Sequence, residues 1–259
     1  MNTTAQTSLS VVMPAYNEEA TISTVLGKVL ALEMVTELLV VDDGSHDRTA
    51  ELVEACPDPR CRLIKQERNG GKTAAVARGI KEAKGDVIII QDADLEYDPA
   101  EIPAVVDPIM LDQADVVYGS RFLVRRAARV LYYYHYLANK FLTCLSNVLT
   151  NHNMTDIETC YKAFRAPVIK AMPFTSSGFG MEVEITAMIT SLPLRIFEVP
   201  ISYYGRTYDE GKKIGMRDGL AAIWYILYYN LIVKRTRVGR TYRKAVQSGM
   251  QAASAGSDA

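Results

Sequence analysis

The sequence predicts an α/β protein built around a mostly parallel central sheet. Short apolar runs alternate with segments of helical periodicity from residue 9 to residue 119. These runs are continuously apolar, which is the pattern of strands that are covered on both faces. Acidic and glycine-containing clusters follow the second and the fourth run. Because ligands of such sheets bind at the carboxyl ends of the strands, the clusters indicate where the site should lie.

Each element of the first half has its own signal. The run 9–13 is apolar and is closed by Pro14, which indicates a buried strand. Segment 21–32 shows helical spacing and follows the acidic pair Glu18-Glu19, which suits a helix N-terminus. The other strands are expected at 37–41, 61–66, 86–90 and 115–119, and the other helices at 47–55, 73–83 and 100–110.

The second half is richer in aromatic side chains. Helices are expected at 131–149, 183–192 and 220–233, and an extended segment at 195–200. The first and the last of these helices are either buried core helices or helices at a membrane surface, where tyrosine and tryptophan suit headgroup depth. A basic cluster follows, formed by Lys234, Arg235, Arg237 and Arg240. The tail 247–259 is mainly alanine, serine and glycine, and we expect it to be disordered.

The overall composition excludes several classes of protein. The chain has 259 residues, 49% of them hydrophobic, and a formal net charge of -1, so its overall charge does not call for nucleic acid. The four cysteines form no CxxC pair and have no histidine partners at zinc spacing. No apolar run reaches the roughly 18 residues that cross a bilayer, and the polar N-terminus is unlike a signal peptide. We therefore expect a cytoplasmic chain, soluble or peripherally attached to a membrane.

Asp92-Ala93-Asp94 is the strongest single motif. Its two carboxylates follow a predicted buried strand and can share one divalent cation. Hard oxygen ligands suit Mg²⁺ or Mn²⁺, and such ions commonly bridge protein carboxylates to substrate phosphates. An isolated motif of this kind is usually a solvated acidic turn. Its place at a strand end, beside other polar clusters, favours a metal site.

Three further motifs fall at the same predicted edge. In Asp42-Asp43-Gly44-Ser45 the glycine permits a tight turn, and a carboxylate at a strand end can bind a ribose or a base edge. In the stretch 14–18, Tyr16 offers an aromatic face for a base, although a helix-capping loop would look similar. Asn69-Gly70-Gly71-Lys72 is a glycine turn at a helix start whose lysine can touch phosphate, without the full spacing of a Walker loop.

Taken in order, these motifs resemble those of glycosyltransferase family 2. The stretch 10–18, the Asp42 turn and Asp92-Ala93-Asp94 carry the resemblance, which covers at least residues 9–122. It implies a GT-A fold, which is a Rossmann-like sandwich with a nucleotide-sugar and a metal ion at the strand ends. The residues expected to hold a donor of the GDP or UDP type are Pro14, Tyr16, Glu18, Asp42, Lys72, Asp92 and Ala93. The residues expected to hold the metal are Asp92, Asp94 and Glu96.

The second half resembles the polyprenyl-phosphate branch of that family, whose best-known members are dolichol-phosphate mannosyltransferases. The stretches 119–122, 156–165 and 178–184, and Arg206 with 211–213, carry this resemblance. It implies that Arg121, with Ser120 and Arg125, contacts the acceptor phosphate, and that Arg206 and Lys212 contact the donor pyrophosphate. Two positions depart from the pattern: Glu96 stands where some members carry glutamine, and Thr159 stands where a glycine is usual.

The reaction implied by this branch needs few catalytic groups. A phosphate monoester has a second pKa of about 6, so at pH 7 it is already an anionic nucleophile and needs no general base. We expect transfer of a hexose-type sugar with inversion, with Asp94, Arg121 and Asp156 as catalytic residues. Transfer to a sugar hydroxyl of another acceptor would need a carboxylate base, for which Asp156, Glu182 and Glu184 are candidates. A non-catalytic nucleotide-sugar-binding subunit is a third alternative, which the intact metal motif disfavours.

The resemblance also divides the chain by task. Residues 1–122 are expected to form the nucleotide-sugar and metal-binding half. Residues 123–246 are expected to form the acceptor-binding and membrane-facing half of the same catalytic domain. Because a polyprenyl tail does not leave the lipid, the enzyme is expected to work as a peripheral protein on the cytoplasmic face of a membrane.

Overall fold

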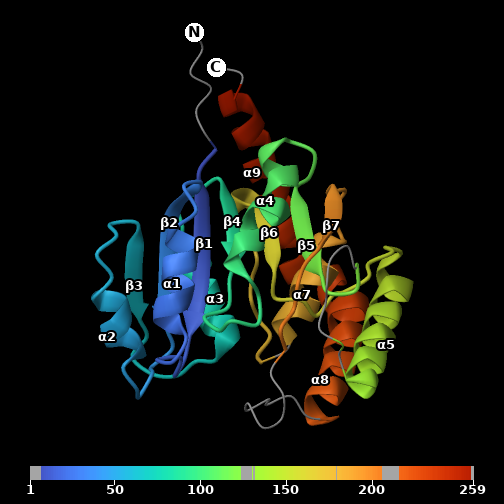
Figure 1. Ribbon diagram of the computed structural model, residues 1–259. Coiled ribbons are helices and arrows are strands. Elements are labelled where there is room, and N and C mark those ends of the chain that lie inside the picture. The colour runs from blue at the N-terminus through green and yellow to red at the C-terminus, as the bar shows by residue number, and fades with distance from the viewer. Residues whose placement is uncertain (1–6, 124–129, 131, 179, 206–215, 258–259) are drawn as a thin grey trace.

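A seven-stranded sheet forms the centre of the protein (Figure 1). The computed structural model describes residues 7–123, 130, 132–178, 180–205 and 216–257. The order of the strands in the sheet is β3-β2-β1-β4-β6-β5-β7. Their bounds are β1 (Leu9–Ala15), β2 (Val35–Asp42), β3 (Cys61–Lys65), β4 (Val87–Ile90), β5 (Val116–Ser120), β6 (Lys162–Arg165) and β7 (Ile196–Pro200). The predicted α/β class is confirmed.

The sheet is parallel except at β6. β1 pairs in parallel with β2 and β4, β2 pairs in parallel with β3, and β5 pairs in parallel with β7. β6 is antiparallel to both of its neighbours, β4 and β5, so these two run in the same direction and their carboxyl ends share one edge. The sequence did not predict β6, because it has only four residues and both Lys162 and Arg165 are charged.

Helices cover both faces of the sheet. α1 (Ile22–Leu30) and α4 (Ile102–Met110, preceded by the short η1, Pro99–Glu101) lie on one face, and α3 (Lys72–Glu82) and α7 (Gly180–Ile189) on the other. Each face of the sheet has its own hydrophobic core, and alternate residues of β1 point into the two cores. Val11 and Met13 pack under α1 and α4, while Val12 packs under α3 and α7. The continuous apolar pattern of the strands therefore has the predicted cause. The shorter α2 (Thr49–Glu54) lies beside β3, and α6 (Ala166–Lys170) follows β6.

Two helices of the second half lie side by side at the lower right of Figure 1. They are α5 (Tyr133–Thr150) and α8 (Met216–Leu227). α8 continues as a π-helical turn, η2 (Tyr228–Ile232), and a 3₁₀ turn, η3 (Val233–Arg235). The expected helices and the extended segment of this half are found close to their predicted positions.

The expectation of a disordered tail from residue 247 is wrong. α9 (Arg237–Ser257) is one helix that continues through most of that segment. Tyr242 and Val246 are buried, and Met250 packs against the same core. This spacing of four residues puts all three on one helical face, which packs near α6. The composition of this segment did not predict a helix, because a few apolar residues are enough to pack α9 against the rest of the folded protein.

Candidate active site

The carboxyl ends of β1, β2 and β4 bring the predicted donor motifs together. Ala15 at the end of β1 lies in register with Asp42 at the end of β2. The Thr21 hydroxyl donates to the Glu18 carboxylate (2.9 Å) and also lies 3.0 Å from the carbonyl oxygen of Ala93. This side chain therefore links the loop after β1 to the metal motif after β4. Four motifs that are far apart in the sequence thus share one edge.

Hydrogen bonds hold the loop after β1 against the loop after β2. The Asn17 amide oxygen accepts a hydrogen bond from the His46 backbone N–H (2.8 Å), and the Ser45 hydroxyl accepts one from the Asn17 N–H (3.0 Å). Tyr16 is 37% exposed, and its ring meets that of His46 edge to face. The Asp42 carboxylate is buried and accepts a long bond from the Ser45 N–H (3.3 Å). An aromatic face and a carboxylate are therefore available at this edge, as predicted for a nucleoside.

Asp43 fixes the glycine turn and was not singled out from the sequence. Its carboxylate accepts hydrogen bonds from the backbone N–H groups of Gly70 and Gly71, each at 2.8 Å, and from the Gln66 amide. Gly71 has a φ of 83°, a conformation that favours glycine, and α3 begins at the next residue. Asp43 is part of the Asp42-Asp43-Gly44-Ser45 motif, so the sequence did point to it. Its role in holding the glycine turn could not be predicted, because its partner Gly70 is 27 residues away.

Lys72 binds the metal motif directly. Its ammonium lies 2.7 Å from the Asp92 carboxylate and 2.8 Å from the Cys160 sulfur. Burial lowers the pKa of Lys72, but the neighbouring negative groups, led by Asp92, together outweigh burial and raise this pKa well above its ordinary value. Burial likewise raises the pKa of Asp92, but the charge of Lys72 and the hydrogen bonds to Asp92 together outweigh burial and lower this pKa. Both groups are therefore charged at neutral pH.

The second aspartate of the motif has different neighbours. The Asp94 carboxylate accepts a bond from the Glu96 backbone N–H (3.0 Å), and the Glu96 carboxylate accepts one from the Tyr203 hydroxyl (2.9 Å). Within the described ranges, no group of three or more histidine, cysteine or acidic side chains is placed to hold a metal ion. Asp92, Asp94 and Glu96 are therefore not grouped as three ligands in the structure, and their role in holding a metal ion stays a prediction. Asp92 and Asp94 still fit a hard divalent ion, because Mg²⁺ usually takes one or two carboxylates and completes its shell with phosphate oxygens and water.

Arg121, at the end of β5, is clamped by Asp156. The guanidinium donates from Nε and Nη2 to the two carboxylate oxygens, at 2.7 and 2.8 Å, and the Arg121 backbone N–H also donates to Asp156. Burial lowers the pKa of Arg121, but the charge of Asp156 and its hydrogen bonds, with smaller contributions from neighbouring tyrosines, together outweigh burial and raise this pKa. The loop with Asp156 is itself held by Glu198 of β7, and the Ser120 hydroxyl lies 2.6 Å from that of Thr155. Two predicted catalytic residues are thus one ion pair.

Three further charged groups lie near these pairs, and of these the sequence analysis had named only Glu182 as a candidate. Glu158 and Glu182 each have a buried carboxylate oxygen without a hydrogen-bond partner, and the buried Lys162 ammonium donates to the Thr159 carbonyl. Burial raises the pKa of Glu158 to about 8, and the Glu182 charge adds to this. The local sequence pattern does not predict the positions of Glu158 and Lys162, because the pairing of Lys162 with Ile90 places β6 and the preceding segment beside β4.

The other predicted residues divide into three groups. Glu184 accepts bonds from the backbone N–H groups of Thr175 and Ser176, so it stabilises a loop. Pro14 lies within β1, opposite Val41, where it contributes no hydrogen-bond donor. Arg125, Arg206 and Lys212 lie outside the described residues.

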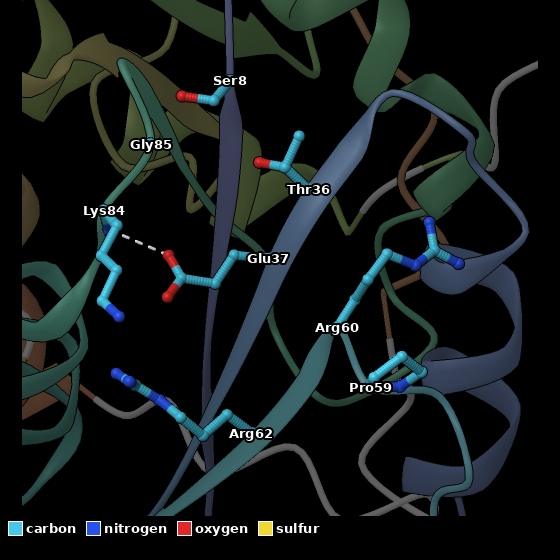
Figure 2. Close-up of a pocket in the computed structure, with 8 residues that line it drawn as sticks. All are labelled: Ser8, Thr36, Glu37, Pro59, Arg60, Arg62, Lys84 and Gly85. Atoms are coloured by element: carbon cyan, nitrogen blue, oxygen red, sulfur yellow. Dashed lines mark hydrogen bonds between the residues drawn. The ribbon is translucent and has the colours of Figure 1, made fainter.

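A separate cavity lies at the opposite edge of the sheet. It has a volume of about 340 Å³ and is lined by Ser8, Thr36, Glu37, Pro59, Arg60, Arg62, Lys84 and Gly85, as Figure 2 shows. These residues stand near the amino ends of β1, β2, β3 and β4. The Glu37 carboxylate accepts a hydrogen bond from the backbone N–H of Lys84 (2.9 Å), which Figure 2 marks with a dashed line. None of the predicted site residues that the structure describes lines this cavity.

The helices α5 and α8 expose many large apolar side chains. Exposed residues include Tyr133, Tyr134, Leu137, Phe141 and Val148 on α5, and Leu220, Trp224 and Leu227 on α8. Phe122, next to Arg121, meets Tyr136 of α5 edge to face at 5.3 Å between ring centroids. Among the described residues, no helix combines the length and the apolar character that a bilayer crossing requires.

Residues 10–172 match the family model described as glycosyl transferase family 2. The chain belongs to this family. A relative that is 32% identical over 211 residues is the undecaprenyl-phosphate 4-deoxy-4-formamido-L-arabinose transferase of Edwardsiella ictaluri; the match covers 79% of this chain and 62% of that protein. The undecaprenyl-phosphate mannosyltransferase of Micrococcus luteus is 28% identical over 82% of this chain and 94% of its own. The resemblance to the polyprenyl-phosphate branch is thereby confirmed.

Solved structures confirm the GT-A fold. Glucosyl-3-phosphoglycerate synthase from Mycobacterium tuberculosis, crystallised with Mn²⁺, uridine-diphosphate-glucose and phosphoglyceric acid, superposes with a TM-score of 0.69. The two chains are 23% identical, and the match covers 87% of this chain and 80% of that one. At this identity the likeness concerns the fold alone.

Proposed function

We propose that this protein transfers a sugar from a nucleotide diphosphate sugar to a polyprenyl phosphate, with inversion at the anomeric carbon. The observation that carries the proposal is that Phe122 connects Arg121 to the aromatic helix α5. Phe122 stacks near the Arg121 guanidinium (5.7 Å) and also meets Tyr136 of α5. A cation suited to phosphate therefore lies beside a surface suited to a lipid tail, at the edge that carries the metal motif. The named activities of the family 2 relatives support the same reaction.

The donor would occupy the edge formed by β1, β2 and β4. The nucleoside would contact Pro14, Tyr16, Glu18 and Asp42, and Lys72 would contact the diphosphate. Asp92 and Asp94 would hold Mg²⁺ or Mn²⁺, which when bound stabilises the departing nucleoside diphosphate as a Lewis acid. We propose that Ala93 contacts the donor and that Glu96 lies close to the metal ion. The donor's base is proposed to be guanine or uracil.

Arg121 would act on the acceptor phosphate. Its Nε and Nη2 are engaged by Asp156, which fixes the plane of the guanidinium and leaves Nη1 to approach the phosphate. Ser120, Arg125 and the donor-side Arg206 and Lys212 complete the predicted contacts to phosphate groups. Since the acceptor is already an anion, the chain needs to position it and neutralise its charge, not to remove a proton.

The acceptor's lipid tail would lie along a membrane surface. We propose that α5 and α8 rest in the interface of the cytoplasmic leaflet, with aromatic side chains at headgroup depth. The exposed Phe141 on α5 and Trp224 on α8 support this arrangement, since apolar side chains of this size are usually buried. The basic residues beyond η2 would add attraction to anionic lipid.

Transfer to a sugar hydroxyl is the second candidate function. Of the three predicted bases, Asp156 is held by Arg121 and Glu184 by a loop, whereas Glu182 keeps an oxygen without a partner. Glu158, with a pKa raised to about 8, is mainly protonated at neutral pH and is therefore the poorer base. A hydroxyl acceptor would accordingly depend on Glu182.

The test is direct product identification. The full chain is incubated with Mn²⁺, polyprenyl phosphate and each of a panel of nucleotide sugars, and the lipid fraction is analysed by mass. A lipid whose mass has increased by one sugar residue is the expected result. Transfer only to saccharide hydroxyls, with the lipid unchanged, would replace this function by the second candidate.

A further inference from the structure

Lys72 forms an ion pair with the first aspartate of the Asp92-Ala93-Asp94 motif. Its ammonium lies 2.7 Å from Asp92 Oδ1, one of the two carboxylates that fit the divalent ion. The position is enforced by the backbone: Asp43 holds the N–H groups of Gly70 and Gly71, and Lys72 is the first residue of α3. A fixed helix start therefore delivers a positive charge to a predicted metal ligand.

The pair is partly shielded from water. The side chains of Lys72 and Asp92 are 31% and 15% exposed, and Cys160 covers the ammonium on another side, at 2.8 Å. Charges that are partly buried interact more strongly than charges in water. The ammonium therefore neutralises much of the field that a dication would find at Asp92.

A nucleotide diphosphate changes this balance. Its oxygens can accept hydrogen bonds from Lys72, whose flexible stem can turn its ammonium away from Asp92. The same oxygens can complete the shell of a metal ion held by Asp92 and Asp94. The diphosphate is thus a partner for both cations that compete for Asp92.

We propose that Lys72 is a displaceable counter-ion of the metal motif, which pairs with Asp92 in the empty enzyme and transfers to the diphosphate when the donor binds. The consequence is coupling: metal alone binds weakly, and nucleotide and metal each strengthen the binding of the other. Such coupling is reciprocal by thermodynamic necessity. It would prevent the enzyme from holding the metal in the absence of donor. The inference rests on the proposed function only in that the donor is a nucleotide diphosphate.

The experiment measures metal binding without any acceptor. Mn²⁺ is titrated into the full chain, and free Mn²⁺ is followed by electron paramagnetic resonance, alone and with saturating UDP or GDP. The proteins are the wild type, Lys72→Met, Lys72→Gln and the control Lys81→Met. Lys81 is exposed and lies on the same helix, in its last turn.

Loss of the ammonium should make Mn²⁺ bind more tightly on its own. We expect Lys72→Met and Lys72→Gln to raise the affinity for Mn²⁺ alone by about tenfold, a typical size for such coupling. The gain in Mn²⁺ affinity from nucleotide should shrink in both variants and stay unchanged in Lys81→Met. Added Mn²⁺ should also raise the unfolding temperature more in Lys72→Met than in the wild type, since ligands that bind only the folded state stabilise it.

The Mn²⁺ titration can also contradict the proposed role of Lys72. An unchanged or lower affinity of both Lys72 variants for Mn²⁺ alone, with folding shown by circular dichroism, overturns the inference. Because the titration with Mn²⁺ alone needs neither nucleotide nor lipid, it tests the role of Lys72 even if the chain uses a different acceptor. Failure of the proposed function appears instead as an absent glycolipid with the Mn²⁺ pattern intact.

Discussion

Cations from other elements hold two aspartates of the site. Lys72 of α3 pairs with Asp92 after β4, and Arg121 after β5 pairs with the buried Asp156. Removing one partner of a buried pair leaves the other charge uncompensated, which typically costs about 3–5 kcal/mol. Each of these residues thus affects stability as well as chemistry, and the stability of every variant has to be measured beside its kinetics.

Asp94→Asn should abolish transfer and leave the fold intact. The substitution removes a negative charge from the end of β4 while keeping an oxygen of similar size, so affinity for metal and for donor diphosphate should fall together. Mn²⁺ titration and donor kinetics check this, with the exposed Asp107→Asn on α4 as the control. Near-normal turnover of Asp94→Asn with unchanged Mn²⁺ affinity would contradict the assignment.

Arg121→Ala should impair use of the acceptor more than use of the donor. Loss of a charge-assisted contact to phosphate costs on the order of 2 kcal/mol, or about thirtyfold in the KM for polyprenyl phosphate. Because Asp156 would be left unpaired, the variant should also unfold at a lower temperature than the wild type. Steady-state kinetics on the folded fraction separate the two effects. A selective rise in the donor KM would speak against the role in acceptor binding.

Glu158 should make stability depend on pH. Burial raises its pKa from 4.5 to about 8, so the folded state prefers the neutral carboxyl. The contribution is fully present below pH 4.5 and is lost as the pH rises through 8, by a change on the order of a few kcal/mol. Glu158→Gln should flatten the pH dependence of the unfolding free energy in this window.

Denaturant melts at several pH values test the role of Glu158. The exposed Glu33→Gln serves as the control, because it lies on the surface after α1. Parallel pH curves for Glu158→Gln and the wild type would show that the Glu158 carboxyl is not the group responsible.

At the scale of elements, the parallel strands were predictable and β6 was not. Continuous apolar runs predict covered parallel strands, and this pattern alone placed Asp42, Asp92 and Asp94 at one edge. β6 is short, bears a buried lysine and arrives from the second half of the chain. Its insertion beside β4 carries Cys160 to Lys72, and its neighbouring loop carries Asp156 to Arg121. The ion pair of Arg121 with Asp156 thus depends on a tertiary contact that local periodicity does not predict.

α9 should contribute measurably to stability. Val246 is 1% exposed and packs in the core that includes Val168 of α6. Val246→Ala removes two buried carbons and should lower the unfolding free energy by about 2 kcal/mol, while the neighbouring Gln247→Ala, at an exposed position, should change it little. Chemical denaturation checks both. Equal stability of the two variants would mean that α9 does not pack as described.

At the scale of the molecule, the site and the apolar surface meet at one end of the sheet. α5 and α8 stand beside the end of β5, so an acceptor could keep its tail in lipid while its phosphate reaches Arg121. The division of the chain at residue 122 remains a prediction. The sheet itself crosses that division, because β4 from the first half pairs with β6 from the second.

Charge reversal of the basic cluster should release the protein from vesicles. Each basic residue near an anionic surface contributes about 1 kcal/mol, screened by salt. Reversal of the exposed Arg235, Arg237 and Arg240 should therefore abolish flotation with anionic vesicles while donor hydrolysis in solution is unchanged. The matched control reverses three other exposed residues, Lys81, Lys84 and Lys170. If the wild type stays in the soluble fraction at low salt, the interfacial role of α5 and α8 is wrong.

The phosphate as nucleophile is the central claim, and a matched pair of acceptors tests it most directly. The measurement is the rate of sugar transfer at pH 7 to a polyprenyl phosphate and to the polyprenol of the same length, with the same donor and Mn²⁺. If no general base is needed, the phosphate is glycosylated and the alcohol is not, and Arg121→Ala slows the reaction of the phosphate. Comparable rates for the alcohol, or transfer to a saccharide hydroxyl that depends on Glu182, would contradict this account.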